Sequence, residues 1–346
     1  MAGQKRGFFT YVSTSVEHEI VVFRLTSTAE APEILQRVAI LPEVATNGMS
    51  TPMALAPDGR FLHVALRKTP LPVVSFAIDR KTGRLERAGV ARLPATSPHL
   101  AVDPSGRVLV SVANPGATLA ITKIKSDGLP RQHASEVVHI GHKVHASVSS
   151  ANGKYLYVSS TDDRQIFQFR LHAKSTHLEP LSPASVTLGN DGDPRHMVVS
   201  PDGRFLYVVT EAGGHVVCFA IDPRSGTLSE QSDVRLAPET FTGDPESADI
   251  HLTPNGRFLY ASTRNGDLLV GYRVDAKTGA LTLVDRWQTE SVPRAFAITP
   301  DGRSLLVAGE KSGRLSAYAI DGKTGRLTKG FDMPIGGRPN WIAFLS

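Results

Sequence analysis

The sequence has one cysteine, two tryptophans and no long apolar segment. A single cysteine excludes an internal disulfide. Cys218 lies in the apolar run 216–219, where we expect a small buried side chain. This cysteine usage favours a reducing, cytoplasmic location. Glu17, His18 and Glu19 interrupt the apolar start of the chain, so we expect neither a signal peptide nor a membrane anchor.

Several functional motifs are also missing. The chain lacks the closely spaced ligands of a zinc site, and its candidate polar residues include too many arginines for a calcium site, so we expect no metal and no cofactor. It has neither the Gly-rich turn of a nucleotide site nor the nucleophile elbow of a serine hydrolase. The net charge of +5 is explained by basic residues in solvated turns, and we expect no nucleic-acid partner.

What the sequence does contain is a repeat. A turn of the Pro-Asp-Gly-Arg type, followed by an apolar strand, begins at Pro57, Pro104, Ala151, Pro201, Pro254 and Pro300. These starts are 47, 47, 50, 53 and 46 residues apart, which is the period of a four-stranded propeller blade. A second turn, of the Asp-x-x-x-Gly type, recurs at 79–83, 222–226, 275–279 and 321–325, and we interpret it as structural.

The blade that begins near Pro194 shows the pattern most clearly. It predicts strands at 195–200, 205–210 and 215–221 and a fourth strand from Thr227. At the chain ends, 8–13, 19–25 and 33–41 fit second, third and fourth strands, and 340–344 fits the missing first strand. The sequence therefore predicts an all-β, seven-bladed β-propeller of four-stranded antiparallel blades. It would be one domain over 1–346, with a closing blade shared by both termini.

The repeat also predicts which residues meet. The start of the first strand and the end of the second lie at the same end of the central channel in a propeller. Six residues before each turn stand Thr51, Pro98, His145, Arg195, Ala248 and Arg294, with Asn340 in the closing blade. Ten residues after it stand Arg67, Asn114, Thr161, Glu211, Arg264 and Glu310, with Thr14 in the closing blade. Histidine, arginine and glutamate would thus share one opening, a set able to transfer protons and hold an anion.

Structural alternatives exist for these residues. His145 could hydrogen-bond a neighbouring blade, Arg195 and Arg294 could form salt bridges between blades with Glu211 or Glu310, and Asp249 with His251 could form a hydrogen-bonded pair. His99 and His196 directly follow ring positions, and the alternation of a strand predicts that they face the other way.

Six phrases of the sequence resemble one family. They are 144–147 (Val-His-Ala-Ser), 192–198 (Gly-Asp-Pro-Arg-His-Met-Val), 248–254, 292–296, 308–312 and 339–341 (Pro-Asn-Trp). The chain resembles the seven-bladed propeller lactonases, most closely the bacterial 6-phosphogluconolactonases. The family also includes fungal enzymes that cyclise carboxy-cis,cis-muconate. In that branch the proposed catalytic set is a histidine, an arginine, a glutamate and a second arginine. The matching positions here are His145, Arg195, Glu211 and Arg264.

We therefore expect hydrolysis of a sugar or sugar-acid lactone, 6-phosphogluconolactone above others. The expected catalytic residues are His145, Arg195 and Glu211, with Glu211 or His145 as general base and Arg195 stabilising the oxyanion. The expected substrate-binding residues are Arg264, Arg294, His196, His251 and Glu310. The alternatives are a muconate-type lactonising lyase and a non-catalytic interaction scaffold. The latter is disfavoured because the chain lacks Trp-Asp dipeptides. The expected partner is a small anionic lactone, bound by a monomer or weak homo-oligomer.

Overall fold

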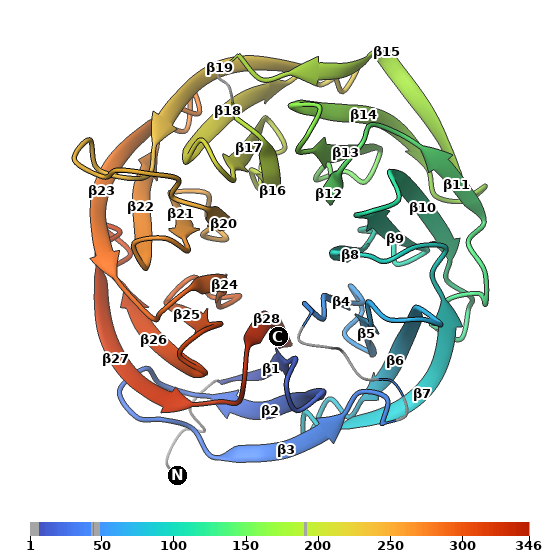
Figure 1. Cartoon of the computed structure of the whole chain (residues 1–346), viewed down its shortest axis with the longest axis horizontal. Helices are drawn as coiled ribbons and strands as arrows, with labels where there is room; N and C mark the ends of the chain where they lie inside the picture. Colours follow the sequence, from blue (N-terminus) through green and yellow to red (C-terminus); the bar gives the residue numbers. More distant parts are fainter. Residues whose placement is uncertain (1–6, 43, 45–48, 190–191, 346) are drawn as a thin grey trace.

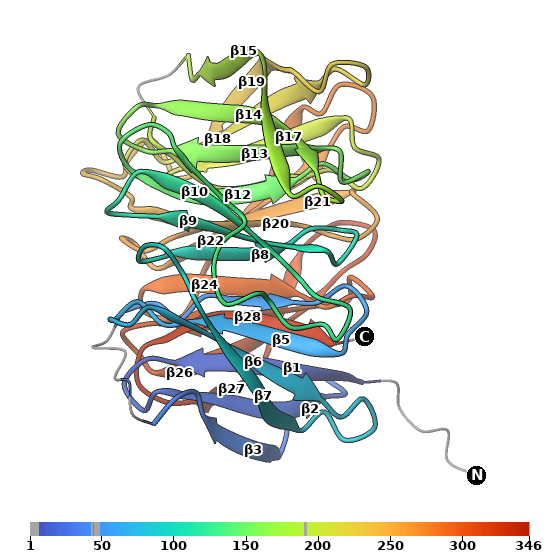
Figure 2. The same ribbon diagram turned by 90° about the vertical axis from the view of Figure 1, so that its right-hand side faces the viewer.

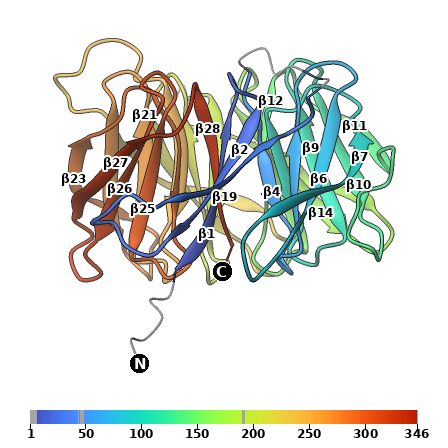
Figure 3. The same ribbon diagram turned by 90° about the horizontal axis from the view of Figure 1, so that it is seen from below.

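The computed structural model describes residues 7–42, 44, 49–189 and 192–345. These residues form 28 β-strands and no helix, arranged as seven four-stranded antiparallel sheets around a central axis (Figure 1). In the side views of Figure 2 and Figure 3, the sheets of successive blades lie next to one another. The described residues accordingly offer no helical membrane span. The predicted all-β, seven-bladed propeller is confirmed.

In blades 1 to 6 the four strands follow sequence order from the channel outwards. Blades 1 to 3 consist of β4 (Met53–Leu55), β5 (Phe61–Ala65), β6 (Pro72–Ile78) and β7 (Leu85–Arg92); β8 (His99–Val102), β9 (Val108–Ala113), β10 (Thr118–Lys123) and β11 (Glu136–His139); and β12 (Val144–Ser149), β13 (Tyr155–Ser160), β14 (Gln165–His172) and β15 (His177–Thr187). Blades 4 to 6 consist of β16 (Pro194–Val199), β17 (Phe205–Thr210), β18 (His215–Ile221) and β19 (Leu228–Arg235); β20 (Ser247–Leu252), β21 (Phe258–Thr263), β22 (Leu268–Val274) and β23 (Leu281–Gln288); and β24 (Pro293–Ile298), β25 (Ser304–Gly309), β26 (Arg314–Ile320) and β27 (Leu327–Pro334).

Blade 7 closes the ring with both ends of the chain. It consists of β28 (Pro339–Leu345), β1 (Phe8–Thr14), β2 (Glu19–Leu25) and β3 (Ile34–Ala39), and β28 pairs antiparallel with β1 with Val12 opposite Ile342. The innermost strand of each blade contacts those of the next and the preceding blade, and β28 contacts β4. The shared closing blade is therefore confirmed. Pairing of the two ends leaves no open edge in the ring.

The hydrophobic core lies between the blades because both faces of each sheet are covered by its neighbours. One cluster joins blades 4 and 5 through Tyr207, Cys218, Ile250 and Leu259, all at most 2% exposed. Cys218 is buried as expected, and burial raises the pKa of its thiol to about 11. Burying an aliphatic side chain such as that of Ile250 or Leu259 contributes about 1.5–3 kcal/mol. The strands that carry the channel residues are therefore held on two sides.

The Asp-x-x-x-Gly turns join neighbouring blades. The Tyr207 hydroxyl of blade 4 donates to the backbone carbonyl of Gly279 in blade 5 at 2.9 Å. Equivalent bonds run from Tyr11 to Gly83, from Tyr157 to Gly226 and from Tyr260 to Gly325. Gly279 has φ +74°, and a Cβ there would lie 2.6 Å from the Phe205 ring. Positive φ and close packing together require glycine at this turn.

The first strands are irregular where they begin. The register with the second strand shifts between Pro194 and Met197 in blade 4. Similar shifts occur near the starts of β12, β20 and β24. Such bulges change the direction of side chains and are frequent next to binding sites. These bulges therefore affect the direction of the side chains that line the channel.

Candidate active site

The candidate site lies at one end of the central channel, which we call the mouth. It forms where each first strand begins and each second strand ends. In blade 4, Pro194 at the start of β16 pairs with Thr210 at the end of β17, so Glu211 directly follows that pair. In the closing blade, the Asn340 side-chain oxygen accepts a hydrogen bond from the Thr51 backbone N–H at 2.8 Å. Residues distant in the sequence therefore meet at the mouth.

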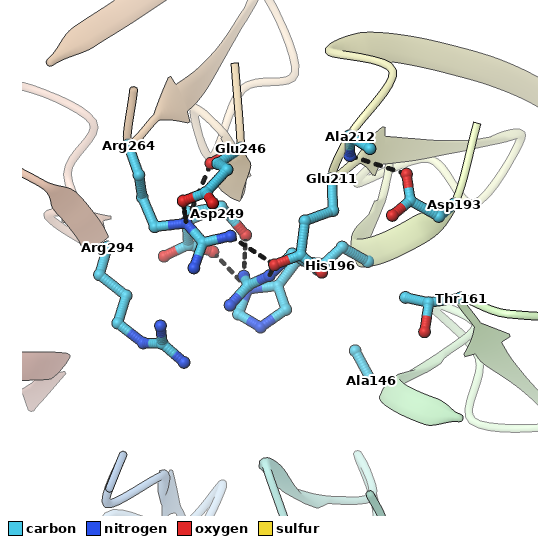
Figure 4. A network of polar contacts seen from close by, with 12 residues as sticks. Ala146, Thr161, Asp193, His196, Glu211, Ala212, Glu246, Asp249, Arg264 and Arg294 are labelled. Atoms are coloured by element: carbon cyan, nitrogen blue, oxygen red, sulfur yellow. Dashed lines mark hydrogen bonds and ion pairs between the residues drawn. The ribbon is translucent and has the colours of Figure 1, made fainter. Parts of the chain in front are cut away.

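Glu211 is the centre of an ion-pair cluster that joins blades 4 and 5 (Figure 4). Arg195 Nε lies 3.4 Å from Glu211 Oε1, and Arg264 donates from Nη2 to the same oxygen. Arg264 also donates from Nε to the Glu246 backbone carbonyl at 3.0 Å. Burial raises the pKa of Glu211, but the charges of Arg195 and Arg264 outweigh it and the pKa is lowered. The Glu211 carboxylate is therefore ionised at neutral pH.

Arg294 and Glu310 form a second cluster in blade 6. Arg294 Nη1 lies 3.4 Å from Glu310 Oε2, and Glu310 also accepts from Arg338 Nε at 3.0 Å. Burial lowers the pKa of Arg294. The ion pairs considered as a structural alternative are thus present, with Arg195 on Glu211 and Arg294 on Glu310, but each lies within one blade and not between blades as expected. These pairs also fix where the guanidinium groups lie.

Positive charge is crowded at the mouth. Arg195 is 2% exposed, and burial together with the charge of Arg294 lowers its pKa to about 9. Burial and Arg294 likewise lower the pKa of Arg67 to about 10. Within the described residues, the buried Nε of Arg195 has no hydrogen-bond partner. An anion bound at the mouth would offset the repulsion between the arginines.

His145 lies beside this charged cluster at the start of β12. It is 6% exposed, and its Nδ1 has no hydrogen-bond partner in the described part of the chain. Burial, with the nearby charge of Arg195, holds the pKa of His145 well below its usual range. The imidazole is therefore neutral. Its ring centroid lies 5.4 Å from that of His196.

A second group of residues lies deeper in the channel. A cavity of about 120 Å³, which we call the chamber, is lined by His99, His196, His251, Phe296, Trp341 and neighbouring residues of the same strands. His196 and Asp249 directly follow the mouth residues Arg195 and Ala248 along β16 and β20. The chamber is therefore the continuation of the mouth into the channel.

The expected orientation of His99 and His196 is wrong. Their ring centroids are 5.6 Å apart, and both rings contact Trp341 in the chamber. Strict alternation fails for two reasons. The two faces of each sheet point to the neighbouring blades, so the channel is lined by the edge of the innermost strand. The register shift between Pro194 and Met197 also redirects the side chains of β16.

Asp249 joins two of these histidines. Its Oδ1 lies 2.8 Å from His196 Nδ1, and its Oδ2 lies 3.3 Å from His251 Nε2. The pair of Asp249 with His251 is the one that the sequence suggested, whereas the shorter contact with His196 comes from the preceding blade and was not anticipated. Figure 4 shows His196 and Asp249 together with the side chains of Glu211, Arg264 and Arg294.

Sequence reasoning missed Trp341 and Arg338. Both flank the ring position Asn340, and the phrase Pro-Asn-Trp was the signal that could have identified Trp341. Six of the candidate residues lie at the mouth: His145, Arg195, Glu211, Arg264, Arg294 and Glu310. The other two, His196 and His251, lie in the chamber. No cluster of three or more potential metal ligands occurs within residues 7–42, 44, 49–189 and 192–345.

Comparisons with known proteins agree with this architecture. The family "Lactonase, 7-bladed beta-propeller" matches residues 9–344. A protein of Serratia proteamaculans named 6-phosphogluconolactonase is 32% identical over 337 residues, covering 97% of this chain and 98% of the relative. A Pectobacterium carotovorum protein of the same name is 32% identical over 288 residues, or 83% of each chain.

A solved structure is similar over nearly the whole chain. The periplasmic gluconolactonase of Pseudomonas aeruginosa superposes with a TM-score of 0.86 at 26% identity and covers 99% of each chain. The family match spans all seven blades, both halves of the closing blade included. On these grounds, the chain belongs to the seven-bladed β-propeller lactonase family.

Proposed function

We propose that this protein hydrolyses 6-phosphogluconolactone to 6-phosphogluconate at the mouth of the channel. The curated relatives of that name support the substrate. One feature of the chain itself carries the proposal: the buried guanidinium of Arg195, among further arginines and paired with an ionised glutamate. Such a site favours a substrate that is anionic and that gains negative charge during the reaction.

The arginines divide into two roles. Arg195 stabilises the oxyanion that forms when water attacks the ring carbonyl, because its guanidinium is positively charged and its position is fixed by Glu211. Arg264 and Arg294 hold the phosphate, where a planar guanidinium can make two hydrogen bonds to one anion. Glu310 orients Arg294 through the ion pair between Arg294 Nη1 and Glu310 Oε2.

The two candidate bases at the mouth differ in their surroundings. Glu211 is held by Arg195 and Arg264, and its lowered pKa makes it a weak base, so we assign it the role of anchoring both guanidiniums. His145 is neutral and free at Nδ1, and it passes a proton to the alkoxide that leaves when the ring C–O bond breaks. His251 is proposed to contact substrate groups that extend into the chamber.

The proposal includes the cellular location and the oligomeric state of the protein. A cytoplasmic location is supported by the single cysteine, which is buried and unpaired. A monomer or weak homo-oligomer is supported by closure of the ring, because pairing of β28 with β1 completes the last blade without a second copy.

Proton release in a pH-stat tests the function, because each hydrolysed lactone yields one carboxylic acid. The substrates are 6-phosphogluconolactone, unphosphorylated gluconolactone and a carboxymuconolactone, each with and without a chelator. We expect the fastest enzyme-dependent release with 6-phosphogluconolactone, unchanged by the chelator. A rate equal to the enzyme-free rate would exclude the proposed hydrolysis. A preference for the muconolactone would move the protein to the lyase branch.

A further inference from the structure

We propose that His196, oriented by Asp249, accepts the proton from the attacking water, and that the chamber holds this water. The inference rests on the proposed hydrolysis and deepens it. It divides the site into two parts. The arginines of the mouth bind the lactone, while the imidazole and carboxylate of the chamber activate the water.

Asp249 is positioned to determine which ring nitrogen of His196 carries the proton. The Asp249 carboxylate, 9% exposed, accepts from His196 Nδ1 at 2.8 Å and from the backbone N–H groups of Ile250 at 3.0 Å and Phe296 at 3.2 Å. Although burial raises the pKa of Asp249, the neighbouring His251 and His196 lower it well below its usual range. An ionised carboxylate requires a proton on Nδ1 of His196, which leaves the lone pair on Nε2. Among the described residues, this Nε2 has no hydrogen-bond partner.

The other imidazoles of the channel are held differently. His99 and His145 have a buried Nδ1 without a partner, and nothing in the described part of the chain fixes their tautomer through that atom. His251 contacts Asp249 through Nε2, at 3.3 Å, and lies further along β20. His196 combines a carboxylate on Nδ1, a free Nε2 and contact with both the mouth residue His145 and the chamber. This is the arrangement by which a carboxylate orients a general base.

The chamber has space for the nucleophile. Its volume of about 120 Å³ exceeds the roughly 10–15 Å³ that a cavity needs to hold one water. His99 lines the chamber, and its unpartnered Nδ1 is a polar group that a water could satisfy. Phe296 and Trp341 supply apolar surface, which strengthens the interaction of His196 with the few polar groups around it.

The proposed step balances. One O–H bond of water breaks as its proton moves to His196 Nε2, and the water oxygen bonds to the lactone carbonyl carbon. When the ring C–O bond breaks, the proton passes through His145, whose ring centroid is 5.4 Å away, to the alkoxide. Both imidazoles are then neutral again, and the new carboxylic acid releases its proton to solvent. Asp249 stays ionised throughout.

Two substitutions test the roles separately. His196→Asn keeps an N–H that can donate to Asp249 and removes Nε2, so we expect kcat for 6-phosphogluconolactone to fall at least ~100-fold with KM changed less than ~3-fold. Asp249→Asn should lower kcat ~10- to 100-fold and shift the pH dependence of kcat, because His196 loses its fixed tautomer. The groups that also influence this profile are His99 on β8, His145 on β12, Arg195 on β16 and His251 on β20.

A matched control uses another imidazole–carboxylate pair. His215 Nδ1 lies 3.0 Å from Asp233 Oδ2 on the outer strands of blade 4. His215→Asn should leave kcat and KM within ~2-fold of the wild type. Free imidazole should restore part of the activity of His196→Ala, because the excised side chain leaves room beside the chamber. A folded His196→Asn protein with wild-type kcat would overturn the inference and leave the proposed hydrolysis intact.

A measurement on the wild-type protein keeps the test independent of folding of the variants. ¹⁵N chemical shifts of the histidine ring nitrogens should show His196 protonated at Nδ1 and not at Nε2. The opposite tautomer would overturn the assignment, whatever the variants do. If the wild type hydrolyses none of the lactones, the proposed function fails and the role of His196 fails with it.

Discussion

Arg195 Nε lies 3.4 Å from Glu211 Oε1, and the two residues come from the beginning and the end of neighbouring strands in one blade. The pair lacks hydrogen-bond geometry at Nε, so within the described residues Arg195 is held by charge and by donation from Nη1 to the Ala248 carbonyl. These contacts fix the guanidinium of Arg195 at the mouth. This fixed positive charge is the basis of the first prediction.

Arg195→Ala should lower kcat for 6-phosphogluconolactone by about 100- to 1,000-fold, the usual effect of removing one oxyanion donor. Glu211→Ala should lower kcat at least ~100-fold, because Arg195 and Arg264 both lose the carboxylate that positions them. Steady-state kinetics by pH-stat measure both effects, and circular dichroism verifies that the fold is retained.

Arg204→Ala is the matched control for these variants. Arg204 is an exposed turn residue paired with Asp202, so its removal should leave kcat within ~2-fold. Full activity of both Arg195→Ala and Glu211→Ala would remove the proposed site from the mouth.

Arg294→Gln should affect phosphorylated and unphosphorylated lactones differently. Loss of a charged contact to phosphate should raise KM for 6-phosphogluconolactone about 10-fold or more, while KM for gluconolactone changes less than ~3-fold. Arg314→Gln provides the control, because Arg314 is in the same blade but pairs with Asp332 on the outer strand. Equal KM changes for the two lactones would show that Arg294 does not contact the phosphate.

The hydrogen bond between blades from Tyr207 to Gly279 should contribute measurably to the free energy of unfolding. Tyr207→Phe removes one buried hydrogen bond and should lower the free energy of unfolding by about 1 kcal/mol. Gly279→Ala should cost more, about 2 kcal/mol or above, because its φ is +74° and the added Cβ would lie 2.6 Å from the Phe205 ring. Urea unfolding at pH 7 gives both values.

Gly322→Ala is the control for the glycine substitution. A Cβ at Gly322 would have no heavy atom within 4 Å, so we expect a change within ~0.5 kcal/mol. If Gly279→Ala changed the free energy of unfolding as little as Gly322→Ala, close packing of the turn against blade 4 would not be what requires glycine at this position.

Acidification should destabilise the protein through its buried histidines. Burial lowers the pKa of His63 from 6.5 to about 4. Below pH 6.5 the unfolded state therefore binds more protons than the folded state, and stability falls as the pH falls towards 4, by up to ~1.4 kcal/mol per pH unit for each such group. His99, His145 and His196 have lowered pKa values and act in the same sense.

His63 allows this effect to be tested outside the site, because it packs in β5 with Nδ1 2.9 Å from Ser75 Oγ. His63→Gln should reduce the dependence of the unfolding free energy on pH between 6.5 and 5 by up to about one proton. The measurement is a series of urea unfolding curves across this range. An unchanged slope would mean that the pKa of His63 does not differ between the folded and the unfolded state.

Much of the fold was predictable because the repeat is local. The apolar runs of β2, β17 and β18 have the predicted bounds, and β28 and β1 pair as the two chain fragments implied. The mouth was predictable for the same reason. A fixed offset from each turn gives the end of a strand, and so brings Arg195, Glu211 and Arg264 to one end of the channel.

The chamber was not predictable in this way. The alternation rule placed His196 away from the site, and the register shift in β16 together with the edge-on position of the strand placed it in the channel. The contact of His196 with Asp249 joins residues 53 positions apart, on adjacent blades. Neither a spacing nor a local motif signals that contact.

The sequence by itself determined the number of blades, the closure of the ring and the end of the channel at which charged groups gather, because each depends only on a period and on the direction of strands. The tertiary structure decided which of these groups touch. Hydrogen bonds and ion pairs form over about 3 Å, and such distances depend on how neighbouring blades pack and where a strand is bulged. The pairing of Asp249 with His196 belongs to this second kind of information.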